Sequence, residues 1–316
     1  MIDSGILLNY IILFAALAVP GYLLGRTGKL NESAFDGMTV ILTDVAMPCL
    51  VFVKLLETDL CGISLFDAAL AFLFPFFISL VLWGISLLLF RRKADRDRQS
   101  ARFCAIFSNC GFLGIPLADA AFPDSPQICS FVAIFNVSST FILLTLGIYI
   151  LSGERKHVSF RGAIFKPVTL AVVLGVILSL AGVGTRFGGI ALYSEILAAL
   201  TTPLAMLVLG AQTSRIPIKE IFFTPSLYLP AAVKLVISPL ITLGALTVLS
   251  YCGIDVSREL AVALFISTGV STAATASAMA KRYGASGRYA AILTLGSTML
   301  CAVTLPLLSL LYKFIF

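Results

Sequence analysis

Eight consecutive residues, Asn109 to Pro116 (Asn-Cys-Gly-Phe-Leu-Gly-Ile-Pro), combine a hydrogen-bonding amide with residues that break helices. They lie inside an apolar segment that is long enough to cross a bilayer, so Gly111, Gly114 and Pro116 should interrupt a membrane helix near its middle. Unwound backbone is tolerated at that depth only where it is buried in protein or lines a cavity. Because interrupted helices hold the substrate site in many transporters, the segment predicts a binding site around Asn109.

A second stretch, Ser267–Thr275, is rich in hydroxyl-bearing and small side chains and lies in another apolar segment. The N-terminus of a half-helix offers free N–H groups and a partial positive charge, which suit a carboxylate, and side-chain donors would complete the pocket. We expect the two stretches to face each other at the membrane centre. The expected substrate-binding residues are Ser108, Asn109, Gly111, Gly114, Pro116, Gly269, Ser271, Thr272 and Thr275. The alternative for the second stretch is a tight contact between unbroken helices.

Ionisable groups inside apolar segments are costly and are functional candidates, and Lys234, Asp44 and Asp119 are three of them. Lys234 lies about 13 Å deep at 1.5 Å per residue, and it either snorkels to the nearer face or carries a functional charge. Asp44 lies at a similar depth in its own segment, so an Asp44–Lys234 ion pair is one hypothesis. Asp119 follows the break at Pro116 by about one turn, and it is either a proton-coupling carboxylate or a cap near the outer face.

The overall composition is that of a membrane protein. The chain is 59% hydrophobic and only 12% charged, with a mean hydropathy of +1.04, whereas soluble domains carry about 25% charged residues. The basic residues lie in short loops between apolar segments, which excludes a nucleic-acid-binding surface. The seven cysteines form no CxxC motif and the single histidine, His157, lies in a basic loop. We therefore expect no metal, no cofactor and no enzymatic site.

Apolar segments of about 20 residues are long enough to cross a bilayer as helices. Ten segments qualify, at about 5–25, 35–56, 63–90, 100–122, 127–151, 164–183, 190–210, 225–250, 259–280 and 289–315. Most Lys and Arg residues lie in one set of alternate loops, and the positive-inside rule places these loops in the cytoplasm. We expect a multi-pass protein of the plasma membrane (the cell inner membrane) with both termini outside.

An offset of 155 residues relates the two halves of the chain. Residues that perturb helices recur at this offset: Pro48 and Pro203, Pro75 and Pro230, Gly114 and Gly269. An odd number of helices in each half would give the halves opposite orientations. The expected fold is therefore an all-α polytopic membrane protein of ten helices. Two inverted five-helix repeats, 1–151 and 164–316, are joined by a cytoplasmic loop at 152–163.

The same residues resemble the auxin efflux carrier family, including its bacterial malate-permease-like members. The resemblance spans essentially the whole chain and rests on Asn109-x-Gly111-Phe112-x-Gly114-x-Pro116-Leu117, on Leu200-Thr-Thr-Pro203-Leu-Ala-Met206-Leu-Val-Leu-Gly210, and on Ala280-Lys-Arg-Tyr283-Gly284 followed by Ser297-Thr298 and Leu305-Pro306. It implies broken fourth and ninth helices that cross at the membrane centre. It also implies a scaffold domain of helices 1, 2, 6 and 7, a transport domain of helices 3–5 and 8–10, and transport of organic anions.

The sequence departs from this family at one position of the second break. Members usually carry proline nine residues before the alanine of the Ala-x-x-Tyr-Gly motif, whereas this chain has Ser271. Serine keeps the backbone N–H that proline lacks. Either the ninth helix is less broken here, or Gly269 and the Ser/Thr cluster supply the break.

The leading interpretation is a secondary transporter, a permease or efflux carrier of small organic anions such as carboxylates, working by alternating access around the crossing. No G-x-x-x-x-G-K-[ST] loop is present, so the membrane potential or a gradient of H⁺ or Na⁺ would drive it. Two alternatives stay open. One is a sodium-coupled bile-acid-type symporter, for which Asn109, Asn136 and Asp119 are the candidate ligands, and the other is a non-transporting receptor or scaffold with the same fold. The expected partners are the anion and the bilayer, and a homodimer through the scaffold helices is undecided.

Overall fold

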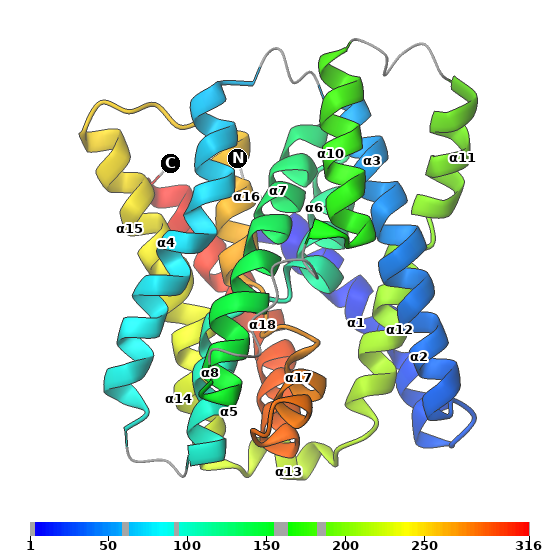
Figure 1. Ribbon diagram of the computed structural model, residues 1–316, viewed down its shortest axis with the longest axis vertical. Helices are drawn as coiled ribbons and strands as arrows, with labels where there is room; N and C mark the ends of the chain where they lie inside the picture. Colours follow the sequence, from blue (N-terminus) through cyan, green and yellow to red (C-terminus); the bar gives the residue numbers. More distant parts are fainter. Residues whose placement is uncertain (1–3, 59–62, 92–94, 155–163, 182–187, 316) are drawn as a thin grey trace.

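The computed structural model describes residues 4–58, 63–91, 95–154, 164–181 and 188–315. Within these ranges the chain is helical and forms no β-strand, and most helices run along the long axis of the molecule (Figure 1). Seven of the described helices are long and apolar enough to cross a membrane: Leu7–Arg26, Glu32–Glu57, Leu65–Leu89, Pro126–Ser152, Ala191–Thr213, Pro225–Tyr251 and Gly287–Tyr312. The prediction of an all-α polytopic membrane protein is confirmed.

The first half of the chain contains α-helices joined by short π-helical turns, labelled η. These elements are α1 (Ser4–Arg26), α2 (Glu32–Ile41), η1 (Leu42–Ala46), α3 (Met47–Glu57), α4 (Leu65–Leu89), α5 (Asp95–Ile106), η2 (Cys110–Gly114), α6 (Ile115–Ala121), α7 (Pro126–Ile142), η3 (Leu143–Gly147) and α8 (Ile148–Ser152).

The second half has a similar succession of elements. They are α10 (Pro167–Leu180), α11 (Gly188–Ala198), α12 (Thr201–Thr213), α13 (Ile218–Phe222), the 3₁₀ turn η5 (Pro225–Leu227), α14 (Tyr228–Ala232), η6 (Val233–Ile237), α15 (Ser238–Tyr251), α16 (Arg258–Gly269), α17 (Ala276–Arg282) and α18 (Gly287–Ile315).

Each of the ten expected apolar segments lies over helix, but three of them do not form a single membrane-length helix. The segment 100–122 is divided between α5 and α6, and the segment 259–280 between α16 and α17. The segment 164–183 contains α10, which is only 14 residues long. The two divided segments are the ones in which the sequence predicts a break.

Three π-helical turns each end two residues before a proline: η1 before Pro48, η2 before Pro116 and η6 before Pro239. A proline lacks the N–H of the helical hydrogen bond, and its ring clashes with the carbonyl group four residues earlier. The wider π-helical turn relieves both conflicts without ending the helix. Such turns are frequent at functional sites, and η1 and η6 carry Asp44 and Lys234.

Two helix pairs approach closely at small residues. α1 packs along α12, where a Cβ added at Gly210 would overlap the carbonyl oxygen of Ala18, and one added at Gly21 would overlap that of Leu207. α3 packs along α10, where Gly175 provides the close approach. Membrane helices associate in this way because small residues let two backbones touch.

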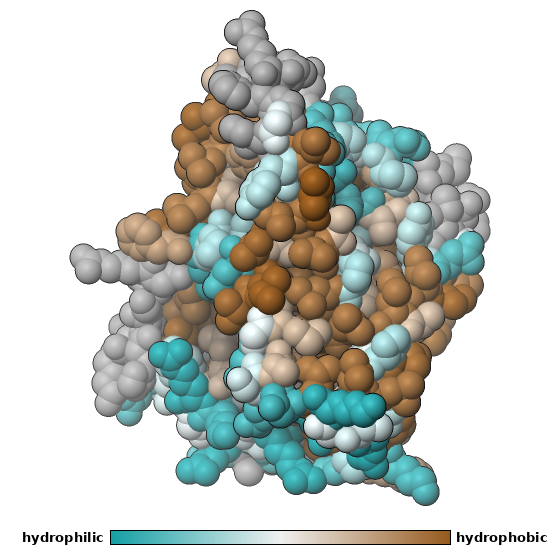
Figure 2. Space-filling model, turned by 90° about the vertical axis from the view of Figure 1, so that its right-hand side faces the viewer, coloured by the Kyte–Doolittle hydropathy of each residue, from teal (hydrophilic) through white to brown (hydrophobic). Residues whose placement is uncertain are grey.

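The surface is divided along the long axis of the molecule. Figure 2 shows hydrophobic side chains over the middle of one face and hydrophilic side chains gathered at the lower end, where α13 and α17 lie in Figure 1. Large apolar side chains on α4 and α10, including Leu73, Leu88, Val173 and Ile177, are at least half exposed. Apolar surface of this extent suits contact with lipid.

Candidate functional site

The two interruptions predicted from the sequence meet in the structure. Residues 107–109 separate α5 from η2, and residues 270–275 separate α16 from α17. An antiparallel bridge between Ser108 and Thr272 joins the two stretches. Segments more than 160 residues apart in the sequence thus lie side by side.

Each break satisfies backbone groups of the other. The N–H of Asn109 donates to the carbonyl of Ser271 over 2.7 Å, and the N–H of Ala273 donates to the carbonyl of Phe107 over 2.9 Å. An unpaired backbone group inside a membrane costs several kcal/mol. The mutual pairing therefore stabilises both breaks.

Hydroxyl groups stabilise the second break in the absence of a proline. The Thr272 hydroxyl donates to the carbonyl of Cys104 over 2.8 Å, and the Thr272 N–H donates to Ser297 Oγ over 3.1 Å. The Thr298 hydroxyl donates to Ser271 Oγ over 3.1 Å. Of the two options left by Ser271, the structure has the one in which the chain is interrupted and the Ser/Thr cluster holds the interruption. A contact between unbroken helices is the wrong interpretation of this stretch.

A cavity of about 640 Å³ lies beside this crossing. Its volume falls within the range of small-molecule sites, about 300–1,000 Å³. Four of the expected substrate-binding residues line it: Ser108, Asn109, Gly111 and Thr275. The remaining walls come from α2 and η1, from α7 and η3, from the start of α10, and from α17.

The amide of Asn109 is the best-placed donor for a ligand in this cavity. Asn109 is only 2% exposed, yet its Nδ2 has no hydrogen-bond partner among the described residues. Buried polar groups nearly always have a partner, and an unsatisfied one costs about 1–3 kcal/mol. Asn109 therefore holds an unused donor beside a space of ligand size.

A second amide lies close to the first. A Cβ added at Gly111 would lie 3.4 Å from Asn136 Oδ1 and 3.0 Å from Met47 Cε, so the Asn136 amide lies directly beside Gly111. Asn136 lines the same cavity as Asn109. A second amide therefore lies beside the first break.

Three charged side chains line the cavity, and of these only Asp44 was singled out in the sequence, as a possible partner of Lys234. Asp44 lies on η1 and accepts a hydrogen bond from the Thr43 hydroxyl over 2.9 Å. Lys166 precedes α10 and Arg282 ends α17. Two cations against one carboxylate leave the cavity with an excess of positive charge, which favours an anionic ligand. In the sequence, Lys166 and Arg282 belong to the set of loop cations that the positive-inside rule places in the cytoplasm.

Five expected binding residues build the crossing and do not line the cavity. Gly114 and Pro116 lie in η2 and at the start of α6, Gly269 ends α16, and Ser271 and Thr272 make the contacts described above.

Lys234 and Asp44 are not brought together as an ion pair: no such contact joins them in the described part of the chain. The Lys234 side chain is 0% exposed, so the snorkelling interpretation is wrong as well. Its Nζ donates to the carbonyl of Thr268 over 2.6 Å, near the C-terminal end of α16. A cation there satisfies an end carbonyl of the half-helix and complements the helix dipole.

Asp119 forms an ion pair that the sequence did not predict. Its Oδ1 lies 3.1 Å from Lys54 Nζ, which also lies 3.0 Å from Glu57 Oε2. Nearby, the hydroxyls of Thr58 and Ser130 share a hydrogen bond of 2.8 Å. These contacts join α3 to α6 and α7 at the end of α3 that lies opposite α17 in Figure 1. Neither partner of the ion pair lines the cavity.

No group of three or more His, Cys, Asp or Glu side chains forms a metal site within the described ranges. His157, and most of the loop expected at 152–163, lie outside those ranges.

Comparisons with known proteins agree with the motifs. A family model described as "Membrane transport protein" matches residues 7–159 and 154–309. An uncharacterized transporter from Methanothermobacter thermautotrophicus (strain Delta H) is 28% identical over 246 residues, which cover 76% of this chain and 78% of that protein. The family match spans nearly the whole chain. The chain therefore belongs to the membrane transport protein family, the auxin efflux carrier-like transporters that its motifs resemble.

Proposed function

We propose that the protein is a secondary transporter of small organic anions such as carboxylates, with the substrate bound in the cavity beside the crossing. The observation that carries the proposal is the buried amide of Asn109: its Nδ2 has no partner among the described residues, and Asn109 is one of the residues that line a cavity of about 640 Å³. A carboxylate is the group that best accepts from such a donor.

The other polar groups of the cavity fit the same ligand. Lys166 and Arg282 supply positive charge, and Asn136 supplies a second amide. A hydrogen bond to a charged group contributes about 1.5–3 kcal/mol, so Asn109 alone would account for roughly a 10- to 100-fold difference in affinity. The apolar residues around them would select for the organic part of the anion.

The helix pairing supports the inverted repeat. α1, the first expected helix, packs along α12, the seventh, and α3 in the second packs along α10 in the sixth. Helices 1 and 6 occupy equivalent positions in the two five-helix repeats, and so do helices 2 and 7. The pair of helices 1 and 7 is therefore equivalent to the pair of helices 6 and 2. We infer that these four helices form the scaffold, and that the remaining helices of repeats 1–151 and 164–316 form the transport domain.

The two ends of the cavity differ in a way that suggests a conformational state. One wall extends to Arg282, at the end of the molecule that carries most of the basic residues and that the positive-inside rule assigns to the cytoplasm. The Lys54–Asp119 pair joins α3 to α6 at the other end. We infer an inward-facing state, in which the cavity is open to the cytoplasm and this ion pair closes it toward the outside of the cell. Both termini would lie on the outer side of the plasma membrane.

The driving force follows from the charge of the substrate. An inside-negative potential favours export of an anion by about 2.3 kcal/mol per charge per 100 mV. Import of the same anion would need coupling to H⁺ or Na⁺. Asp44, Asn109 and Asn136 line one cavity, and this favours a sodium-coupled symporter as the second candidate.

The test is uptake of radiolabelled malate and indole-acetate into proteoliposomes under an imposed potential, pH gradient or Na⁺ gradient. Asn109→Ala should lower saturable flux at least tenfold. It should not lower the melting temperature, because it removes a donor that has no described partner. Gln212→Ala, which removes an amide that does not line the cavity, is the matched control and should transport like wild type.

Equal flux in the two variants would contradict the proposed site. Flux that requires Na⁺ would favour the symporter. Thermal stabilisation by a substrate without flux under any gradient would favour a receptor.

A further inference from the structure

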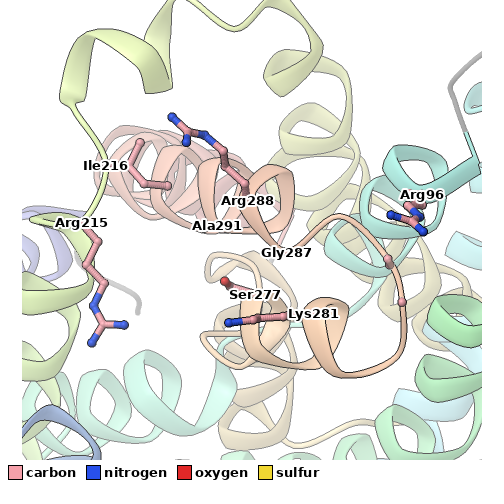
Figure 3. Close-up of a pocket in the computed structure, with 10 residues that line it drawn as sticks. Arg96, Arg215, Ile216, Ser277, Lys281, Gly287, Arg288 and Ala291 are labelled. Atoms are coloured by element: carbon pink, nitrogen blue, oxygen red, sulfur yellow. The ribbon is translucent and has the colours of Figure 1, made fainter. Parts of the chain in front are cut away.

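A second cavity, of about 510 Å³, lies at the end of the molecule where α17 meets α18. Four cationic side chains from separate elements line it: Arg96, Arg215, Lys281 and Arg288 (Figure 3). In the close-up, Lys281 extends from α17 toward the side of the cavity where Arg215 lies. Among the described residues, no carboxylate lines this cavity.

Three of these cations have no acidic partner. Arg288 pairs with Glu220 through two nitrogens at 2.8–3.0 Å, but Arg96, Arg215 and Lys281 form no ion pair with any other described residue. The Arg215 guanidinium instead lies over an aromatic ring, 4.2 Å from its centre. Figure 3 shows the four cations around the cavity on different sides, so their combined positive potential would attract an anion into it.

A third cavity, of about 300 Å³, is apolar and is lined mainly by α1, α12 and α18. Thr213, the last residue of α12, lines the apolar cavity, and Arg215, two residues later, lines the basic one. On α18, Ala291 lines the basic cavity and Met299 lines the apolar one. These two residues lie about 12 Å apart along the helix axis. A charged compartment is therefore followed by an apolar one in the direction of the membrane interior.

We propose that an anionic phospholipid binds across these two cavities, with its phosphate in the basic cavity and one acyl chain in the apolar cavity. Basic pockets between membrane helices are known to take anionic headgroups. A soluble phosphate would use only the basic cavity, and a neutral lipid would leave its charges unpaired. The binding site is separate from the cavity at the crossing and does not depend on what the protein transports.

The bound lipid would contact both α12 and α18. Under the domain division proposed above, these helices belong to the scaffold and the transport domain. The lipid would then join the parts that must move during transport, and this consequence alone rests on the proposed function.

The test measures lipid binding by the purified full-length protein, by native mass spectrometry and thermal melting. The probes are phosphatidylglycerol, phosphatidylcholine and soluble glycerol phosphate. The double variant Arg96→Gln/Lys281→Gln should bind phosphatidylglycerol about 25-fold more weakly than wild type at low salt. The double variant Arg26→Gln/Lys29→Gln removes the same charge from exposed positions outside the cavity and should bind like wild type.

A second pair of variants tests the acyl chain. Ala302→Phe fills the apolar cavity and should release the lipid, whereas Val303→Phe changes the next residue, which is 60% exposed outside the cavity, and should not. If Ala302→Phe fails to fold, the charge variants decide the question. Binding of glycerol phosphate or phosphatidylcholine as tightly as phosphatidylglycerol would overturn the proposal. So would charge variants that bind like their control.

Discussion

Replacing Gly210 by alanine should destabilise the protein through the contact between α1 and α12. A Cβ at this position would overlap the carbonyl oxygen of Ala18 and lie 2.9 Å from both the carbonyl carbon of Ala18 and the amide nitrogen of Tyr22. Carbon contacts are normally about 3.5–4.0 Å. All three atoms belong to the backbone, so no side chain can rotate away, and the two helices must separate.

The size of the effect follows from a comparison with a glycine that has free space. Gly244, on α15, has no atom within 4 Å of the position of an added Cβ. Both substitutions gain the helix preference of alanine over glycine, about 0.5–1 kcal/mol, and this gain cancels between them. The difference is the overpacking term, about 1–3 kcal/mol.

Thermal unfolding of the two purified variants in the same detergent measures that difference. At about 2 °C per kcal/mol for a chain of this size, Gly210→Ala should melt roughly 2–6 °C below Gly244→Ala. Equal melting temperatures, or a higher one for Gly210→Ala, would refute the close backbone approach of α1 and α12.

Two further predictions concern charged groups. Lys234→Met loses the hydrogen bond to Thr268, which stabilises the protein by about 1.5–3 kcal/mol. The same change removes the desolvation penalty of a buried ammonium, which is larger and destabilising. The variant should therefore melt no lower than wild type, and a clearly lower melting temperature would mean that the ammonium is stabilised by a further partner. Lys54→Glu should shift the protein toward an outward-open state by about 1 kcal/mol, roughly fivefold, if the pair with Asp119 closes the outer side. The readout is the rate at which an external thiol reagent labels Thr140→Cys in the cavity, which should rise about fivefold in Lys54→Glu. The charge reversal Lys54→Glu/Asp119→Lys should return the labelling rate to that of the Thr140→Cys protein with the native pair.

The first break could be predicted from the sequence because its causes are local. Gly111, Gly114 and Pro116 disfavour a continuous helix whatever surrounds them, and the chain leaves α-helical geometry directly before them. The second break could not be predicted with the same force. Its backbone groups take partners from distant segments, such as Ser297 and Phe107, and a sequence does not show which segments will meet.

The charged groups show the same limit. Depth along a helix could be counted for Lys234, but whether a lysine snorkels depends on which neighbours cover it, and here all of its surface is covered. Lys166 and Arg282 were expected only to set topology. Their place in the cavity wall follows from how α10 and α17 pack around the crossing, which no local pattern encodes.

The hydrogen bonds between the two breaks also bear on how the protein is made. The N–H of Asn109 is hydrogen-bonded to the carbonyl of Ser271, which is synthesised 162 residues later. The carbonyl of Phe107 likewise pairs with the N–H of Ala273, which is also synthesised later. At about 5–20 residues per second, the ribosome needs roughly 10–30 s to deliver these partners. During that time the first break cannot rest in lipid with its backbone groups unpaired. The α5–α6 segment must stay at the membrane surface or beside the insertion machinery until α16 arrives, so the first half of the protein completes its insertion only when the second half does.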